Sequence, residues 1–135
     1  MANLETSFAG LSLRNPLIAG SSGLTNSLSK IKEMEQAGVG AIVLKSLFEE
    51  QIESHSEKLA SISDYPEAVD YINTYVKMNH VEKYLDLIRS AKEECKIPIV
   101  ASINCYKQDR WTDFAKSIEN VGADALELNV VMLNA

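Results

Sequence analysis

The chain has 135 residues, of which 13 are Lys or Arg and 19 are Asp or Glu, so its formal net charge is −6. Hydrophobic residues make up 46% of it. This composition suits one ordinary soluble domain and excludes intrinsically disordered, collagen-like and mucin-like proteins. An acidic chain also argues against general binding to nucleic acid, because such binding needs clustered Lys and Arg to displace counterions. We therefore expect one globular domain and no nucleic-acid partner.

The sequence predicts neither a membrane span nor a secretory signal. Its longest apolar stretches, such as 41–44 and 97–101, are far shorter than the roughly 20 residues that cross a bilayer. Residues 1–7 lack a basic region followed by an apolar one. Two cysteines, Cys95 and Cys105, make no disulfide framework. We expect a cytoplasmic protein with no membrane partner.

Four short apolar runs predict the strands of a parallel sheet. The runs at 41–44 and 97–103 are rich in β-branched residues and do not alternate with polar ones, which is typical of strands buried on both faces. The run at 16–20 precedes a cluster of Ser and Gly, and the run at 125–129 lies near the end of the chain.

Amphipathic helices are predicted between these strands. The first places apolar residues at three-residue steps from Leu28 and stops before Gly38, the second covers about 79–95, and the third follows Asp109 and ends at Gly122. Strands that alternate with helices imply right-handed crossovers and an α/β fold. The stretch 46–78 has only fragmentary helical spacing and predicts a long connecting loop.

An internal repeat relates two strand ends. Residues 35–45 align with residues 119–129 at one constant offset, with Glu, Gly, Ala and Leu at matching places. The repeated unit reads as a glycine that ends a helix, a short turn and a buried strand. Lys45 and Asn129 thus close two strands at equivalent places. In parallel α/β folds, ligands bind at that end of the sheet.

Small or polar residues follow all four predicted strands, which makes them candidate ligand-binding residues. Hydroxyl and amide side chains offer hydrogen bonds, a glycine allows close approach of the backbone, and a lysine supplies one positive charge. Each could instead be an ordinary turn or loop-capping residue. The candidates are Ser21, Ser22, Gly23, Lys45, Ser46, Asn104 and Asn129.

Lys45 has several possible roles. A lysine that closes an apolar strand could form a Schiff base, bind phosphate or hydrogen-bond a cofactor carbonyl, or could simply extend to solvent.

His55 and His80 are far apart and lack the spacing of metal ligands, so we predict no metal site.

Four segments in order resemble the first half of dihydroorotate dehydrogenases and their close relatives. The matching segments are 15–18 with 21–23, 43–46, 97–104 and 122–129. The resemblance implies an FMN-containing TIM (β/α)8 barrel, of which this chain would supply about four βα units, preceded by a hairpin at about 6–14. It implies an FMN-dependent oxidoreductase of the kind that converts dihydroorotate to orotate in pyrimidine biosynthesis, with a dihydroorotate-like small molecule as its substrate.

The resemblance also implies roles for individual residues. Ser21, Ser22, Gly23, Lys45, Ser46, Asn104 and Asn129 would bind the flavin, while Lys45, Asn73 and Asn79 would contact the substrate. Members of the family place a Cys or Ser base shortly after the residue that matches Asn129. Here Val130 to Ala135 follow, and no such base is visible.

The length implies an incomplete barrel, because a (β/α)8 barrel takes about 250 residues. Half a barrel exposes two sheet edges and an uncovered apolar face, so we expect a fragment, inactive alone, that self-associates. Two alternatives stay open. The chain could be a catalytically silent half-barrel association module, or a barrel lyase that uses Lys45 as a Schiff-base former.

Overall fold

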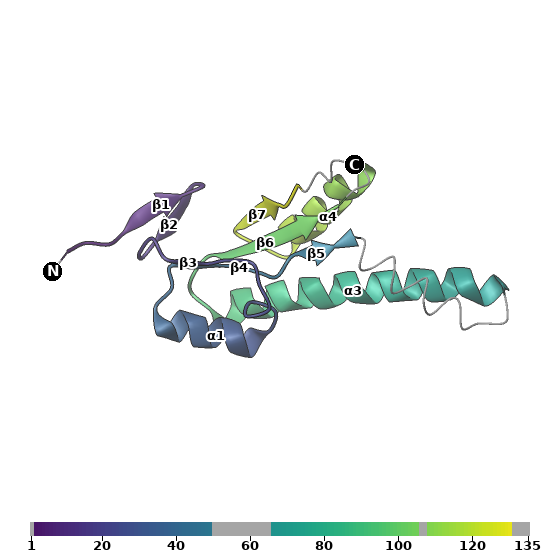
Figure 1. Ribbon diagram of the computed structural model, residues 1–135, viewed down its shortest axis with the longest axis horizontal. Coiled ribbons are helices and arrows are strands. Elements are labelled where there is room, and N and C mark those ends of the chain that lie inside the picture. Colours follow the sequence, from purple (N-terminus) through teal and green to yellow (C-terminus); the bar gives the residue numbers. More distant parts are fainter. Residues whose placement is uncertain (1, 50–65, 106–107, 131–135) are drawn as a thin grey trace, which may run out of the picture.

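A computed structural model describes residues 2–49, 66–105 and 108–130. These residues form an α/β structure with one parallel sheet, a separate hairpin and three helices (Figure 1). In chain order the elements are β1 (Thr6–Phe8), β2 (Leu11–Leu13), β3 (Ile18–Ala19), α1 (Leu28–Ala37), β4 (Ala41–Val43), β5 (Leu47–Phe48), α3 (Pro66–Glu94), β6 (Ile99–Asn104), α4 (Gln108–Asn120) and β7 (Ala125–Leu128). None of the helices in the described ranges has both the length and the apolar character needed to cross a bilayer.

The hairpin of β1 and β2 lies beside the sheet. Its two-residue turn has Ala9 at φ 49° and Gly10 at φ 78°, and two positive φ values match the right-handed twist of the flanking strands. After the hairpin, Arg14 Nε donates to the Val39 carbonyl at 2.9 Å, and Asn15 Nδ2 donates to the Gly38 carbonyl at 2.7 Å. These bonds tie the chain that follows the hairpin to the end of α1.

The four predicted strands pair in parallel in the order β3, β4, β6, β7. The short β5 also pairs with β6, through Leu47 with Ile103. β7 pairs with one edge of β6, while β4 and β5 both pair with the other edge, where β5 follows β4. Leu47 is four residues after Val43, but their partners on β6, Val100 and Ile103, are only three residues apart. One extra residue therefore forms a bulge between β4 and β5.

The predicted loop over 46–78 is wrong in two places. Leu47–Phe48 is β5, and α3 begins at Pro66, about 13 residues before the predicted start of that helix. The early part of α3 projects past the end of the sheet (Figure 1). The sequence of this part has only fragmentary helical spacing, which is too weak to predict where the helix begins. Residues 50–65 of the predicted loop lie outside the described residues.

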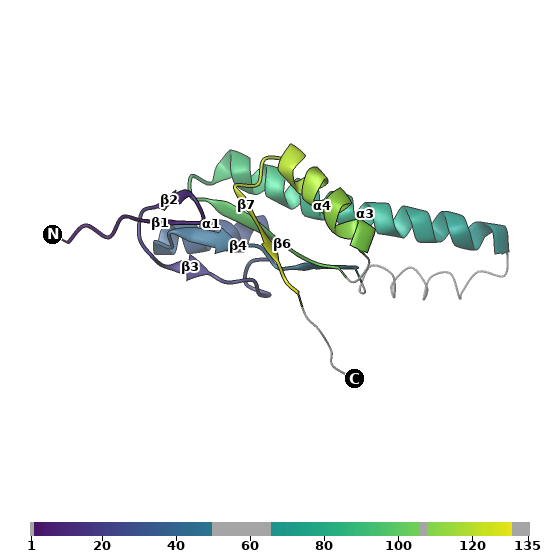
Figure 2. The ribbon, with the colours of Figure 1, turned by 90° about the horizontal axis from the view of Figure 1, so that it is seen from above.

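The three helices of the described residues all pack on one face of the sheet. The core joins Ile31 of α1, Ile88 of α3 and Ile118 of α4 to Ile42 and Ile99 of the strands, and each is at most 3% exposed. Figure 2 shows α3 and α4 on the same side of β6. Residues that alternate with these along the strands, such as Val100 and Ser102, point to the other face. None of the described helices covers that face.

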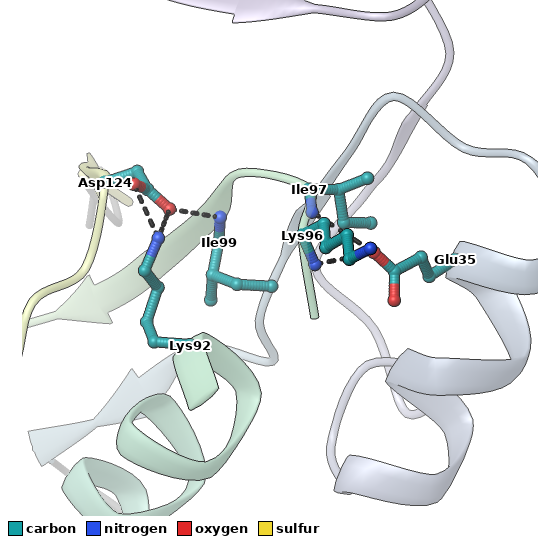
Figure 3. Close-up of polar contacts among 6 residues, drawn as sticks. All are labelled: Glu35, Lys92, Lys96, Ile97, Ile99 and Asp124. Carbon is teal, nitrogen blue, oxygen red and sulfur yellow. Dashed lines mark hydrogen bonds and ion pairs between the residues drawn. The ribbon is translucent and has the colours of Figure 1, made fainter. Parts of the chain in front are cut away.

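Two carboxylates hold the start of β6 (Figure 3). Glu35 Oε1 accepts from the backbone N–H groups of Lys96 and Ile97, at 2.7 and 3.2 Å. Asp124 Oδ2 accepts from the N–H of Ile99 at 2.7 Å and also pairs with Lys92 Nζ at 2.7 Å. These bonds satisfy backbone donors at the N-terminal end of the sheet, so the carboxylates there have a structural role.

Candidate functional site

A cavity of about 660 Å³ lies at the carboxyl ends of the parallel strands. Six of the seven candidate residues for cofactor binding line it, together with residues of β5 and β7 and of the segment after β7. The lining residues are Ser21, Ser22, Gly23, Lys45, Ser46, Phe48, Glu127, Leu128, Asn129 and Val130. These segments are distant in sequence and meet because parallel strands end at the same edge of the sheet.

Two further candidates with described side chains, Asn79 and Asn104, are not among the residues that line this cavity. Asn104, at the end of β6, contacts it through Asn129, because its Nδ2 donates to the Asn129 carbonyl at 2.7 Å. Asn73 and Asn79 both belong to α3, which packs on the helical face of the sheet. Their assignment as substrate contacts stays a prediction, as does the assignment of the lining residues to flavin.

A chain of hydroxyl groups runs under the cavity from the end of β3 to β7. Ser21 Oγ lies 3.1 Å from Ser46 Oγ, which lies 2.7 Å from Ser102 Oγ. Ser102 Oγ donates to Glu127 Oε1 at 2.6 Å. This row of hydrogen bonds includes one side chain from each of β6 and β7 and one from the segment after each of β3 and β4. The ends of the four strands are therefore linked by side chains as well as by the backbone.

Ser102 and Glu127 were not predicted as site residues from the sequence. Ser102 is fully buried within an otherwise apolar run, and a polar residue in such a run needs a hydrogen-bond partner. That requirement was the available signal in the sequence. It says that a partner exists, but only the folded sheet identifies Ser46 and Glu127 as the partners.

The turn after β3 is held in place by buried Thr25. Ser22 N–H donates to Thr25 Oγ1 at 3.2 Å, and the Thr25 N–H donates to the Ser22 carbonyl at 3.1 Å. The Thr25 carbonyl in turn accepts from the N–H of Lys45 at 3.2 Å. The turn and the residue after β4 therefore form one connected unit, with the Lys45 side chain exposed at the rim of the cavity.

The donor set of the cavity suits a planar polar ligand that carries several hydrogen-bonding atoms. Serine hydroxyls and the Asn129 amide both donate and accept, and the Lys45 ammonium donates only. The Lys45 cation favours partial negative charge on a ligand, while the Glu127 carboxylate in the same wall accepts hydrogen bonds. Among the described residues, no group of three His, Cys, Asp or Glu side chains could hold a metal ion. His55 lies outside those residues, and His80 is in α3.

Cys105, which follows β6, is expected to react slowly with thiol reagents. It is 8% exposed, and burial, with a smaller effect of the Glu49 charge, raises the pKa of its thiol to about 11. At pH 8 we expect labelling in the folded chain to be at least about tenfold slower than in urea, because the thiolate is the reacting form. A Cys95→Ser variant isolates this thiol for the measurement. Equal rates in the two states would contradict the expectation.

Comparison with known proteins found relatives but no matching family model. The chain is 30% identical over 131 residues to the catalytic subunit of dihydroorotate dehydrogenase B (NAD(+)) from Thermoplasma volcanium. It is 29% identical over 131 residues to the protein of the same name from Thermoplasma acidophilum. Each match covers 96% of this chain and 42% of the relative. The chain is thus homologous along nearly all its length to dihydroorotate dehydrogenase catalytic subunits, and it spans less than half of them.

Proposed function

From this homology we propose that the chain is one part of an FMN-binding (β/α)8 barrel in an oxidoreductase related to dihydroorotate dehydrogenase. The observation that carries the proposal is the cavity at the strand ends, because residues from three distant segments of the chain converge there. Barrel enzymes of this type keep their active sites at the carboxyl ends of the strands.

The arrangement of layers supports an incomplete barrel. A (β/α)8 barrel has a closed parallel sheet with helices only on its outer side. Here α1, α3 and α4 pack on one face of the sheet, and in the described residues the strand order follows the chain, apart from β5. The face without helices corresponds to the inside of a barrel, where the hydroxyl chain from Ser21 to Glu127 would lie.

The lining residues fit a flavin. When bound, FMN supplies the hydride acceptor for oxidation of a dihydroorotate-like substrate. Lys45 would stabilise negative charge on the polar edge of the ring system, and Ser21, Ser22 and Asn129 would hydrogen-bond its oxygen and nitrogen atoms. Gly23 lines the cavity without a side chain and would allow the backbone close to the ligand.

Flavin binding is tested by titrating the purified chain with FMN and following flavin fluorescence and co-elution on gel filtration. We expect binding, and we expect Lys45→Ala to weaken it at least about tenfold, because a charge-assisted hydrogen bond is lost. The matched control is Lys116→Ala, an exposed lysine of α4 that is not among the residues lining the cavity. It should leave affinity unchanged.

The opposite result would favour a different function. If FMN co-elutes with none of the oligomeric forms of the chain, the proposed flavin site is wrong. The chain would then be better described as a silent association module that keeps the barrel-derived fold.

We also propose that the chain self-associates through its sheet edges. β3 and β7 each pair with only one strand among the described residues, and unpaired edges are templates for association. Apolar side chains at these edges are exposed, with Leu17 at 64%, Leu128 at 55% and Val130 at 66%. Two copies joined at these edges would resemble one closed barrel.

Light scattering should report a dimer or a larger assembly. Leu128→Lys should shift the chain toward monomer, because it adds a charge to the exposed edge strand. Leu4→Lys is the matched control, since Leu4 is also exposed, at 59%, but precedes the hairpin. A monodisperse monomer of the unaltered chain would contradict self-association.

A further inference from the structure

We propose that Tyr84 of α3, which does not line the cavity, is a positioning residue for it. Its hydroxyl bonds backbone groups of β6 that would otherwise form a hydrogen bond with the segment joining β4 to β5. This bond keeps in place the bulge that carries Lys45 and Ser46. The consequence for ligand binding rests on the proposed flavin site. The structural part concerns the chain alone and can be tested separately.

The hydrogen bonds along this edge of β6 show where the regular pattern stops. Ile42 N–H donates to the Pro98 carbonyl at 3.1 Å, and Leu44 N–H donates to the Val100 carbonyl at 2.8 Å. Continued by one step, the pattern would pair the N–H of Ser46 with the carbonyl of Ser102. The N–H of Ser46 instead donates to Ser21 Oγ at 3.0 Å.

Tyr84 satisfies the backbone groups that this change leaves at Ser102. Its hydroxyl donates to the Ser102 carbonyl at 3.0 Å and accepts from the Ser102 N–H at 2.9 Å. Ser102 is fully buried and Tyr84 is 9% exposed. A buried backbone donor and acceptor without partners would be costly, and one phenol hydroxyl can serve both.

The bulge is therefore held from two sides. Thr25 binds the N–H of Lys45 and Ser21 binds that of Ser46, while Tyr84 occupies the Ser102 groups that would otherwise draw Ser46 back into register. A one-residue change of register moves side chains to the other face of a sheet. By stabilising the bulge, the Tyr84 hydroxyl helps to keep both Lys45 and Ser46 on the face of the sheet that lines the cavity.

The Tyr84 hydroxyl keeps its proton over the whole neutral range. Burial is the main reason, since it raises the pKa of Tyr84 to about 12, and the hydrogen bond with the Ser102 backbone opposes it only in part. The bridge between α3 and β6 is therefore the same at every pH at which a flavin titration would be run.

The test is Tyr84→Phe, followed by amide hydrogen exchange and amide chemical shifts in NMR spectra. We expect exchange at Ser102 to accelerate at least about tenfold and the amide signals of Lys45 and Ser46 to move, because Phe cannot bond the Ser102 backbone. The matched control is Tyr75→Phe, which alters an exposed tyrosine of the same helix and should change neither. Unchanged exchange and shifts in Tyr84→Phe would overturn the proposal.

If Tyr84→Phe does not fold, Ser21→Ala decides the question. Tyr84 should then stay bonded to Ser102, and the Ser46 amide, without the Ser21 hydroxyl, should exchange at least about tenfold faster. A Ser46 amide that keeps its protection would mean that it bonds Ser102, against the proposal.

The flavin readout separates this inference from the proposed function. If the unaltered chain binds FMN, Tyr84→Phe should weaken binding about tenfold while Tyr75→Phe does not; unchanged affinity would overturn the positioning role. If the unaltered chain binds no FMN, the proposed function fails, and the amide measurements still judge the structural role of Tyr84.

Discussion

Replacing Ile99 with alanine is expected to lower the free energy of unfolding by about 2 to 5 kcal/mol. Ile99 is 0% exposed and begins β6, the central strand, where it packs in the core between the sheet and the helices. The variant loses the transfer free energy of the removed atoms and leaves a cavity that close-packed neighbours cannot fill completely. Urea unfolding followed by circular dichroism measures the change.

Ile99→Val is the control for that measurement. It removes one methylene group and should cost about 0.5 to 1.5 kcal/mol. If Ile99→Ala cost no more than Ile99→Val, the region around β6 would have to be loosely packed, which contradicts its burial.

Gly40→Ala is expected to destabilise the chain by about 3 kcal/mol, because the added Cβ collides with backbone. That Cβ would lie 2.2 Å from the carbonyl oxygen of Asn15. The oxygen cannot move away freely, since the flanking Asn15 side chain is bonded to the Gly38 carbonyl and the N–H of Gly40 donates to the Leu17 carbonyl at 2.7 Å. Thermal unfolding should show the loss as a lower midpoint.

Gly20→Ala is the matched control for Gly40→Ala. No atom lies within 4 Å of the place where the Gly20 Cβ would be, and its backbone is not in the left-handed region. Its stability should stay within about 0.5 kcal/mol of the unaltered chain. Equal destabilisation by both changes would show that the contact with Asn15 is not the cause.

The regular part of the fold could be predicted from local patterns. Apolar β-branched runs predicted the strands, and the glycines that end two helices were correctly identified, since Gly38 and Gly122 adopt φ values of 103° and 88°. Because ligands bind at the carboxyl ends of parallel strands, the sequence predicted that Lys45, Asn129 and the serines after β3 belong to one site. The structure brings these residues to one cavity.

Three features could not be predicted in this way. The first half of α3 projects past the sheet and shows only fragmentary helical spacing in the sequence. The rings of its Tyr71 and Tyr75 stack with their centroids 6.4 Å apart. The short β5 is recognisable only by its pairing with β6. The bonds of Tyr84 to Ser102 join residues 18 positions apart.

By itself the sequence determined the α/β class, the parallel strands and the polar residues at their ends, because these depend on the apolar or polar character of neighbouring residues. Only the tertiary structure decided the bulge at Lys45 and Ser46, the hydroxyl chain to Glu127 and the role of Tyr84. The reason is that a buried polar group must find a partner, and which partner lies within 3 Å depends on how distant segments pack.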